Sequence, residues 1–170
     1  MELNKEVYKS ALKYIISWCE NKANVGKTVI CKLLYFSDFN YYEIYETPLT
    51  CETYLKYERG PYPSHIDDVL DEMIEAGEVI RELKPYYNST IYKYYLDKAP
   101  DLAILTTKML SVINEVIDSL SGKSANEISE YSHGDMPWLA AGDNENLDYE
   151  FVFYRDDEYS VREYDEWLYC

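Results

Sequence analysis

Residues 25–45, VGKTVICKLLYFSDFNYYEIY, decide the fold predicted for this chain. The stretch begins at a glycine-containing break and extends for about five helical turns. Its apolar side chains form two adjacent stripes at helical spacing, Ile30, Leu33, Leu34 and Tyr41 on one and Val29, Leu33, Phe36 and Ile44 on the other. A surface helix needs only one stripe, so this wide band predicts a helix covered on several sides, at the centre of a small domain.

The bulk composition predicts one soluble domain. A chain of 170 residues can bury roughly 68–70% of its unfolded surface without disulfides or metals. The 20 tyrosines favour contact surfaces, because each combines a large ring with a polar tip. There is no apolar run of about 20 residues and no signal-peptide pattern, so we expect a cytoplasmic protein. The four cysteines lack metal-ligand spacing, and we expect free thiols and no cofactor.

The net charge of −16 is unevenly distributed. Residues 1–98 hold 12 basic and 16 acidic side chains, whereas residues 99–170 hold 4 basic and 16 acidic ones. This field repels a phosphate backbone, so we expect a basic protein partner and neither nucleic-acid nor membrane binding.

The periodicity predicts an α+β, mostly α-helical domain of about five helices. Besides residues 25–45, helices are expected over 4–20, from 64 to the glycine at 77, over 106–121 and over 124–131. A short strand is expected over 53–58 and a β-hairpin from strands over 79–84 and 91–96. This order resembles a winged helix. The helix before the hairpin is acidic on its exposed side, which argues against a DNA-binding role.

The ends of the predicted helices carry capping signals. Asn4 and Thr106 stand at N-cap positions, and capping boxes are expected from Ser64 with Asp67 and from Ser124 with Glu127.

Residues 1–142 are predicted to form the domain, and residues 143–170 an acidic, aromatic C-terminal extension. The extension holds ten acidic and two basic side chains among many aromatic ones, and this aromatic density argues against simple disorder. We expect a strand over 149–154 and a short helix over 158–168. The extension either folds back on its own domain or forms a contact surface.

Two local patterns resemble a nucleotide-binding and a catalytic motif, but neither meets the requirements of that motif. The GKT at residues 26–28 resembles the end of a phosphate-binding loop, but position 21 is Asn instead of glycine and a helix precedes it. Ser132, His133 and Asp135 suggest a catalytic triad, but neighbours in sequence usually point apart. No catalytic residue is predicted, and an enzyme acting through His133 and Asp135, or through a thiol, is a further hypothesis that no arrangement in the sequence supports.

The segment RGPYP at residues 59–63 is predicted to be a stiff loop, because two prolines restrict φ and the glycine permits a tight approach. Stiff aromatic loops lose little entropy on binding, although such a loop can also serve only to turn the chain. The residues predicted to bind a partner are Tyr54, Tyr57, Arg59, Gly60, Pro61, Tyr62, His133 and Trp138.

An ordered set of motifs resembles the Panacea domain, the SocA-like antitoxin family. The motifs are Lys32-Leu33-Leu34-Tyr35, Asp38, Thr47-Pro48-Leu49, Tyr54, Gly60-Pro61-Tyr62-Pro63-Ser64, Ser124-Ala125, Ile128-Ser129 and Ser132-His133 followed by Trp138. They span roughly residues 10–142. Two positions depart from the family pattern: Glu46 replaces a usual glycine, and Tyr62 replaces a usual valine.

The resemblance implies a mostly helical domain with small β elements and no chemistry of its own. It implies an antitoxin that neutralises a cognate toxin by direct binding, or an adaptor that delivers the toxin to a host protease. Such proteins are often encoded by phages or mobile elements. The alternative function is an acidic phage or mobile-element inhibitor that mimics nucleic acid and blocks a host nucleic-acid-binding enzyme.

Overall fold

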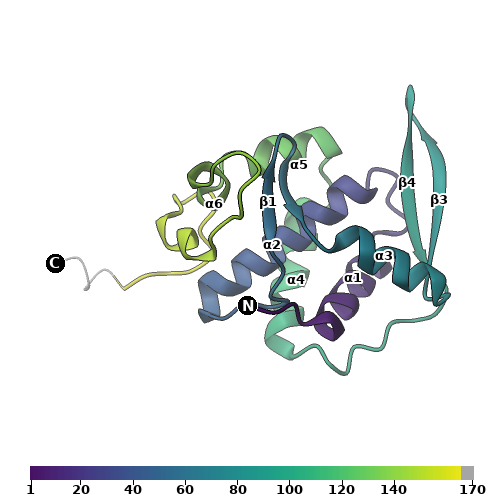
Figure 1. Ribbon diagram of the computed structural model, residues 1–170, viewed down its shortest axis with the longest axis horizontal. Helices are drawn as coiled ribbons and strands as arrows, with labels where there is room; N and C mark the ends of the chain where they lie inside the picture. The colour runs from purple at the N-terminus through teal and green to yellow at the C-terminus, as the bar shows by residue number, and fades with distance from the viewer. Residues whose placement is uncertain (166–170) are drawn as a thin grey trace.

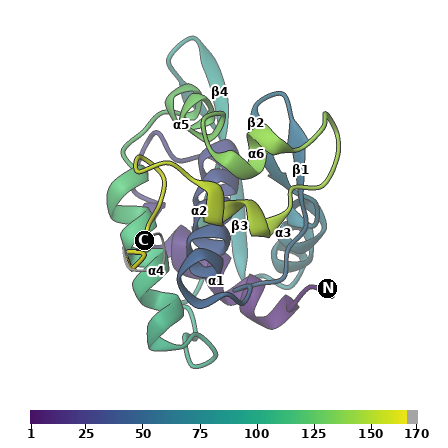
Figure 2. The same cartoon turned by 90° about the vertical axis from the view of Figure 1, so that its left-hand side faces the viewer.

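The computed structural model describes residues 1–165 of the chain (Figures 1 and 2). Its elements are, in order, α1 (Lys5–Cys19), α2 (Lys27–Tyr45), β1 (Tyr54–Tyr57), β2 (Gly60–Pro63), α3 (Ile66–Glu75), β3 (Val79–Tyr86), β4 (Ser89–Leu96), α4 (Thr107–Leu120), α5 (Ala125–Ser132), α6 (Met136–Ala140) and the 3-10 helix η1 (Tyr149–Tyr154). The α+β, mostly helical class is confirmed. Among these described residues, no helix combines the length and the apolar character needed to cross a membrane.

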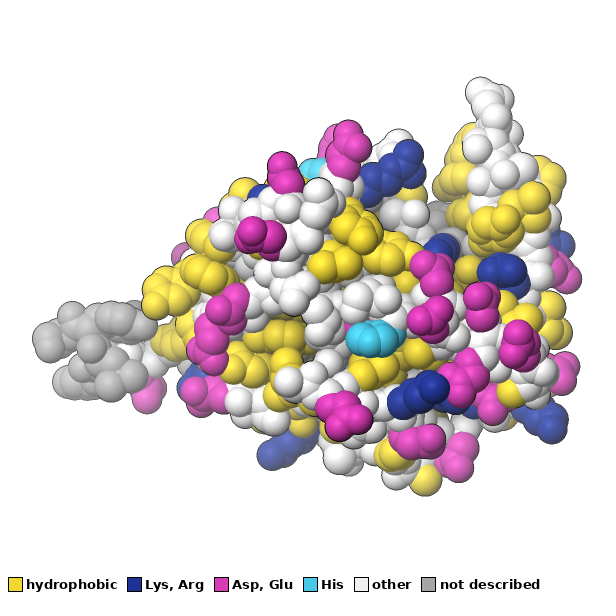
Figure 3. All heavy atoms as spheres, viewed as in Figure 1, with side chains coloured by type: hydrophobic (Ala, Val, Ile, Leu, Met, Phe, Trp, Pro, Cys, Tyr) yellow, Lys and Arg dark blue, Asp and Glu magenta, His cyan; other side chains and the backbone are white. Residues whose placement is uncertain are grey.

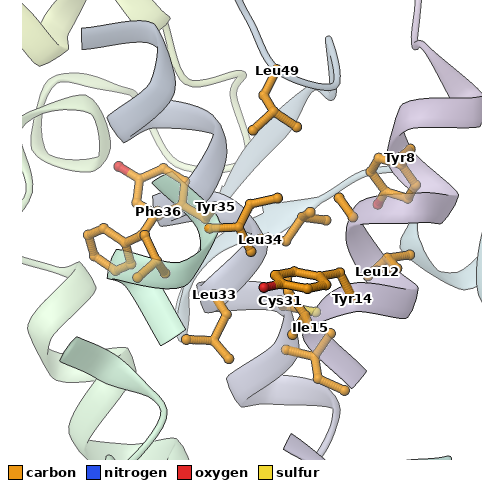
Figure 4. Close-up of a cluster of buried hydrophobic side chains, with 14 of the residues drawn as sticks. Tyr8, Leu12, Tyr14, Ile15, Cys31, Leu33, Leu34, Tyr35, Phe36 and Leu49 are labelled. Carbon is orange, nitrogen blue, oxygen red and sulfur yellow. The ribbon is translucent and has the colours of Figure 1, made fainter. Parts of the chain in front are cut away.

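Helix α2 is the centre of the fold, as predicted. Thirteen of its 19 residues are buried, and it contacts α1, α4, α5, β2, β4 and η1. Figure 4 shows part of this core, to which α1 contributes Tyr8, Leu12 and Ile15 and α2 contributes Leu33 and Leu34. A helix surrounded on this many sides cannot be amphipathic in the usual sense, which explains the wide apolar band in its sequence.

Three of the four predicted helix caps are present. The side chains of Asn4 and Thr106 accept hydrogen bonds from backbone N–H groups of α1 and α4, and Ser124 with Glu127 forms the full capping box of α5. The capping box predicted at Ser64 is wrong, because α3 begins two residues later and Ser64 Oγ donates to Glu52 instead.

The segment predicted as a stiff loop is the second strand of a hairpin. Strand β2 pairs antiparallel with β1, with Tyr54 opposite Pro63 and Tyr57 opposite Gly60. Two prolines are tolerated because β2 is an edge strand whose other side needs no N–H donors. The single strand expected over residues 53–58 therefore has a partner that the two prolines concealed.

The second hairpin, β3–β4, was predicted within two residues at each end. It projects from the body beside α3 like a wing, and Figure 3 shows hydrophobic side chains on its flank and acidic side chains over α3. At its base, Tyr94 is buried, and Lys93 Nζ donates to the carbonyl oxygens of Lys22 (2.6 Å) and Val25 (2.7 Å) beyond the end of α1.

The first part of the extension folds back on the domain. Backbone hydrogen bonds join residues 144–147 to the free edge of β1, so this segment lies against the first hairpin. Tyr149 then stacks on Phe39 of α2, with ring centroids 4.1 Å apart.

Buried ion pairs hold the next part of the extension. The Arg155 guanidinium donates to both oxygens of Asp135 (2.8 and 2.7 Å) and to Glu43 Oε1 (3.0 Å), and all three side chains are fully buried. Glu43 also accepts from Ser160 Oγ (2.6 Å) and from the backbone N–H of Val161 (3.1 Å).

Two elements predicted in the extension are wrong. Residues 149–154 form the 3-10 helix η1, because the Asp148 side chain caps its start and its residues contact α2 and α6. Residues 158–165 are not helical, since their polar groups turn toward Glu43. The remainder of the predicted helix, residues 166–168, lies outside the described residues.

Candidate partner-binding site

The tip of the β1–β2 hairpin stands between two hollows in the surface. One is a cavity of about 370 Å³ lined by Lys27, Thr28, Cys31, Lys32, Tyr57, Glu58, Arg59, Gly60 and Tyr62. The other, of about 420 Å³, is lined by Lys56, Tyr57, Glu58, Trp138, Asp143 and Asn144. Tyr57 and Glu58 border both hollows, so the hairpin tip forms a ridge that a partner could contact from either side.

Aromatic side chains stiffen this ridge. Tyr57 is 40% exposed and stacks on Tyr62, with ring centroids 5.3 Å apart. Tyr62 lies opposite Leu55 in the hairpin, so Tyr57 is its diagonal neighbour, a separation that two aromatic rings can bridge. The exposed Arg59 lies at the turn.

Trp138 supports the other side of the ridge. Its ring stacks on His133 (4.4 Å between centroids), and its Nε1 donates to the carbonyl oxygen of Tyr57 (3.4 Å). Lys56 Nζ lies 4.2 Å from the centre of the Trp138 ring and donates to Ala141 O (2.9 Å). A cation in this position is attracted by the ring face, so Lys56 orients the tryptophan.

Three of the predicted contact residues are buried. Tyr54 is fully buried, packs on Tyr35 and Phe39, and donates its hydroxyl to Asp38. The prediction of Tyr54 as a partner contact is therefore wrong, because an alternating strand beside α2 must turn one side chain into the core. Gly60 and Pro61 are also buried and act on the surface only by shaping the hairpin.

Gly60 is required by close packing. Its φ of +110° lies in a region that side chains rarely adopt. A Cβ here would clash with Ser132 Oγ of α5 and lie 2.8 Å from Lys32 Cε of α2. The glycine thus lets the hairpin lie directly on these two helices.

Charges at the cavity rim are partly paired. Asp67 accepts from the Tyr62 hydroxyl (2.6 Å) and forms an ion pair with Lys27. Burial and the Asp67 carboxylate raise the pKa of Tyr62 to about 12. Burial by itself would lower the pKa of Lys27, but the interactions with Asp67 and Tyr62 outweigh it and raise the pKa.

The side chains of Ser132, His133 and Asp135 do not converge. Ser132 Oγ donates to Ser129 O (2.6 Å), His133 stacks on Trp138, and Asp135 is held by Arg155 and by the Tyr35 hydroxyl (2.8 Å). The three side chains therefore make separate structural contacts. Over residues 1–165, no group of three or more His, Cys, Asp or Glu side chains is placed to hold a metal ion.

The comparison with known families decides the identity. The family of SocA-like antitoxins, Panacea domain, matches residues 30–139. The chain belongs to this family. The matched segment of the Panacea domain runs from within α2 to α6 and contains the complete hairpin ridge. It also contains all residues that line the two hollows, except Lys27, Thr28, Asp143 and Asn144. No curated protein and no solved structure matches the chain.

The family's usual glycine before Thr47 has a structural explanation in this Panacea domain. Glu46 occupies that position, ends α2 and has a φ of +57°, in the left-handed region that glycine adopts without strain. The backbone geometry of the turn is therefore kept although the residue differs.

Of the cationic residues of the site, the sequence identifies Arg59 as a contact residue but not Lys32 or Lys56. Lys32 stands in the sequence only as the first residue of the Lys32-Leu33-Leu34-Tyr35 motif, and no sequence pattern marks Lys56. A lysine within the widest apolar band of the chain was the available signal, because lysine is rarely buried without a reason.

Proposed function

We propose that this protein is a non-enzymatic antitoxin that neutralises a protein toxin by direct binding. Membership of the SocA-like antitoxin family is the observation that carries the proposal. The ridge at the β1–β2 tip supports it, since exposed Tyr57 and Arg59 are presented by a rigid hairpin. Tyrosine and arginine are enriched among the residues that dominate binding energy in protein interfaces.

The acidic surface favours a basic toxin as the partner. The net charge of −16 would steer such a partner at long range and speed association at low salt. Delivery of the bound toxin to a host protease is the second form of the proposal, and it uses the same first contact. The two forms differ in outcome, because delivery shortens the toxin's half-life only when the protease is present.

Co-expression with the protein encoded by the adjacent gene tests the proposal. The neighbour alone should arrest growth, and this protein should restore growth and co-purify with the neighbour. The double substitution Tyr57→Ala with Arg59→Ala should weaken the complex, whereas Tyr154→Ala should not. Tyr154 is a matched control because it is 69% exposed and lies on η1, away from both hollows. A harmless neighbour that does not bind would contradict the proposal.

The nucleic-acid-mimic alternative would need an acidic surface that presents charges like a phosphate backbone. A chain lacking residues 143–170 should lose inhibition of a nucleic-acid-binding enzyme if that alternative holds. Full antitoxin activity with no such inhibition by the intact chain favours the first proposal.

A further inference from the structure

We propose that the 370 Å³ cavity beneath the β1–β2 hairpin is a binding pocket for a single carboxylate, supplied by an acidic side chain of the protein partner. The inference rests on the proposed function, and it specifies what the partner places in the site. The cavity is closed below by α2 and on one side by the hairpin, and it contains lysine and arginine side chains in an otherwise acidic protein.

Lys32 is the central observation. Its side chain lines the cavity, yet the residue is only 2% exposed, and its Nζ donates to Pro61 O at 3.1 Å. A lysine ammonium has three donors, and within residues 1–165 no carboxylate lies within ion-pair distance of this one. Burying an ion without a counterion is costly, by several kcal/mol in general. An anion bound in the cavity would supply the missing partner.

The neighbours of Lys32 do not supply that negative charge. Burial raises the pKa of the Cys31 thiol to about 11, so Cys31 is neutral at pH 7. Burial, and then the positive charge of Arg59, lower the pKa of Lys32 itself. Both effects disfavour the free ammonium, and both would be offset by a carboxylate.

Lys93 is a buried lysine whose ammonium group has several hydrogen-bond acceptors within the protein. Its Nζ donates to the carbonyl oxygens of Lys22 and Val25 at 2.6 and 2.7 Å, and a third carbonyl, that of Cys19, lies at 3.5 Å. These oxygens lie at and just beyond the end of α1, where a cation is stabilised by the helix dipole. Lys32 has one acceptor where Lys93 has three, so the two lysines serve different purposes.

The charge balance of the cavity indicates one carboxylate. Lys27, Lys32 and Arg59 face Glu58 and Asp67 around the rim, which leaves a surplus of one positive charge. A phosphate group would carry about two negative charges into a protein whose net charge is already −16. A singly charged carboxylate matches the surplus.

The remaining walls fit the rest of an acidic side chain. The stacked rings of Tyr57 and Tyr62 offer an apolar surface for methylene groups. Thr28 lines the floor in the first turn of α2, and the Gly26 N-cap gives that turn no side-chain hydrogen bond. The positive end of the helix therefore adds to the attraction for an anion.

The test measures backbone amide NMR shifts of the intact protein during titration with N-acetyl-glutamate methylamide. The amides of Arg59 and Gly60 should shift saturably, with a Kd on the order of 1–10 mM. The glutamine analogue, which differs only in charge, should cause no such shift, and inorganic phosphate should bind more weakly. N-acetylalanine, whose only carboxylate is at the chain end, should bind more weakly than the glutamate analogue. Tighter binding of N-acetylalanine would overturn the assignment of the pocket to an acidic side chain.

Substitutions assign the binding to the cavity. Lys32→Met should abolish the saturable shift and leave the unfolding midpoint unchanged or higher, whereas Lys93→Met should lower the midpoint. Arg59→Gln provides a variant in which folding is not at risk, because Arg59 is exposed, and it should weaken binding as well. Equal shifts with the glutamate and glutamine analogues, or no saturable shift with either carboxylate, would overturn the inference.

The complex with the toxin gives a separate readout. Lys32→Met should weaken toxin binding at least about 30-fold, as expected when one member of a buried charge pair is removed. A toxin bound normally by Lys32→Met would overturn the inference and leave the proposed function intact. If the cavity binds a carboxylate but the protein neutralises no toxin, the proposed function is contradicted and the carboxylate pocket is not.

Discussion

Replacing Arg155 by methionine should destabilise the folded protein by about 3–5 kcal/mol. The substitution keeps an apolar stem of similar length and removes a guanidinium that is fully buried between Asp135 and Glu43. Two carboxylates would then remain in the interior without their cation. Removing one member of a buried ion pair costs this much because the charge left behind is both desolvated and unpaired.

The measurement is equilibrium unfolding in urea with tryptophan fluorescence, together with thermal melting. For a domain of this size, a loss of 3–5 kcal/mol lowers Tm by about 6–20 °C. Arg162→Met is the matched control in the same extension. Its guanidinium lies 3.5 Å from a Glu46 carboxylate that is 65% exposed, so the expected loss is about 0–1 kcal/mol.

A double substitution tests the cause. Asp135→Asn in the Arg155→Met background should recover part of the lost stability, because it removes one unpaired charge and keeps an oxygen to accept from the Tyr35 hydroxyl. A loss below about 1 kcal/mol for Arg155→Met, or further destabilisation in the double variant, would refute the reasoning that Arg155 neutralises these carboxylates.

Three further predictions concern single positions. Burial raises the pKa of Asp38 to about 7, so the folded state binds this proton more tightly than the unfolded state does. The stability that Asp38 contributes is therefore present below about pH 4 and is lost as the pH rises to about 7. Urea midpoints at pH 4.5 and 7.5 should show this loss in the natural protein relative to Asp38→Asn, and a pH-independent difference between the two proteins would contradict it. Gly60→Ala should lower the unfolding free energy by several kcal/mol, because it adds backbone strain and a clash with Ser132. Gly122→Ala, with no atom within 4 Å of the added Cβ, should change the unfolding free energy by less than about 1 kcal/mol. Equal effects of the two substitutions would refute the packing explanation. Glu46→Gly should raise the unfolding free energy by about 1 kcal/mol, since a left-handed residue is relieved of strain, and a lower melting temperature would count against this.

Much of the fold follows from local patterns. The two apolar stripes of residues 25–45 predicted the central helix, and the sequence positions of Asn4, Thr106 and Ser124 predicted where three helices begin. The wing was recognisable from alternating residues around a turn. Each of these features depends on residues within a few positions of one another, where periodicity and capping chemistry are reliable.

The partner of β1 was hidden for a different reason. Two prolines in four residues indicate a loop, because proline cannot donate to a sheet. Strand β2 tolerates them only at the edge of a two-stranded hairpin, and Gly60 then lets that hairpin lie against α2 and α5. Whether a strand is at an edge is a property of the sheet, which no local pattern contains.

The sequence by itself determined helices α1 to α5, the β3–β4 hairpin, the acidic surface and the family of this protein. Only the tertiary structure decided that Tyr54 is buried, that Arg155 joins Asp135 and Glu43, and that Lys32 lines a cavity with no counterion among residues 1–165. Arg155 lies 112 positions from Glu43 in the chain. Local periodicity reports which side of an element is apolar, but the pairing of charges depends on which elements meet, and that is decided by how the whole core packs.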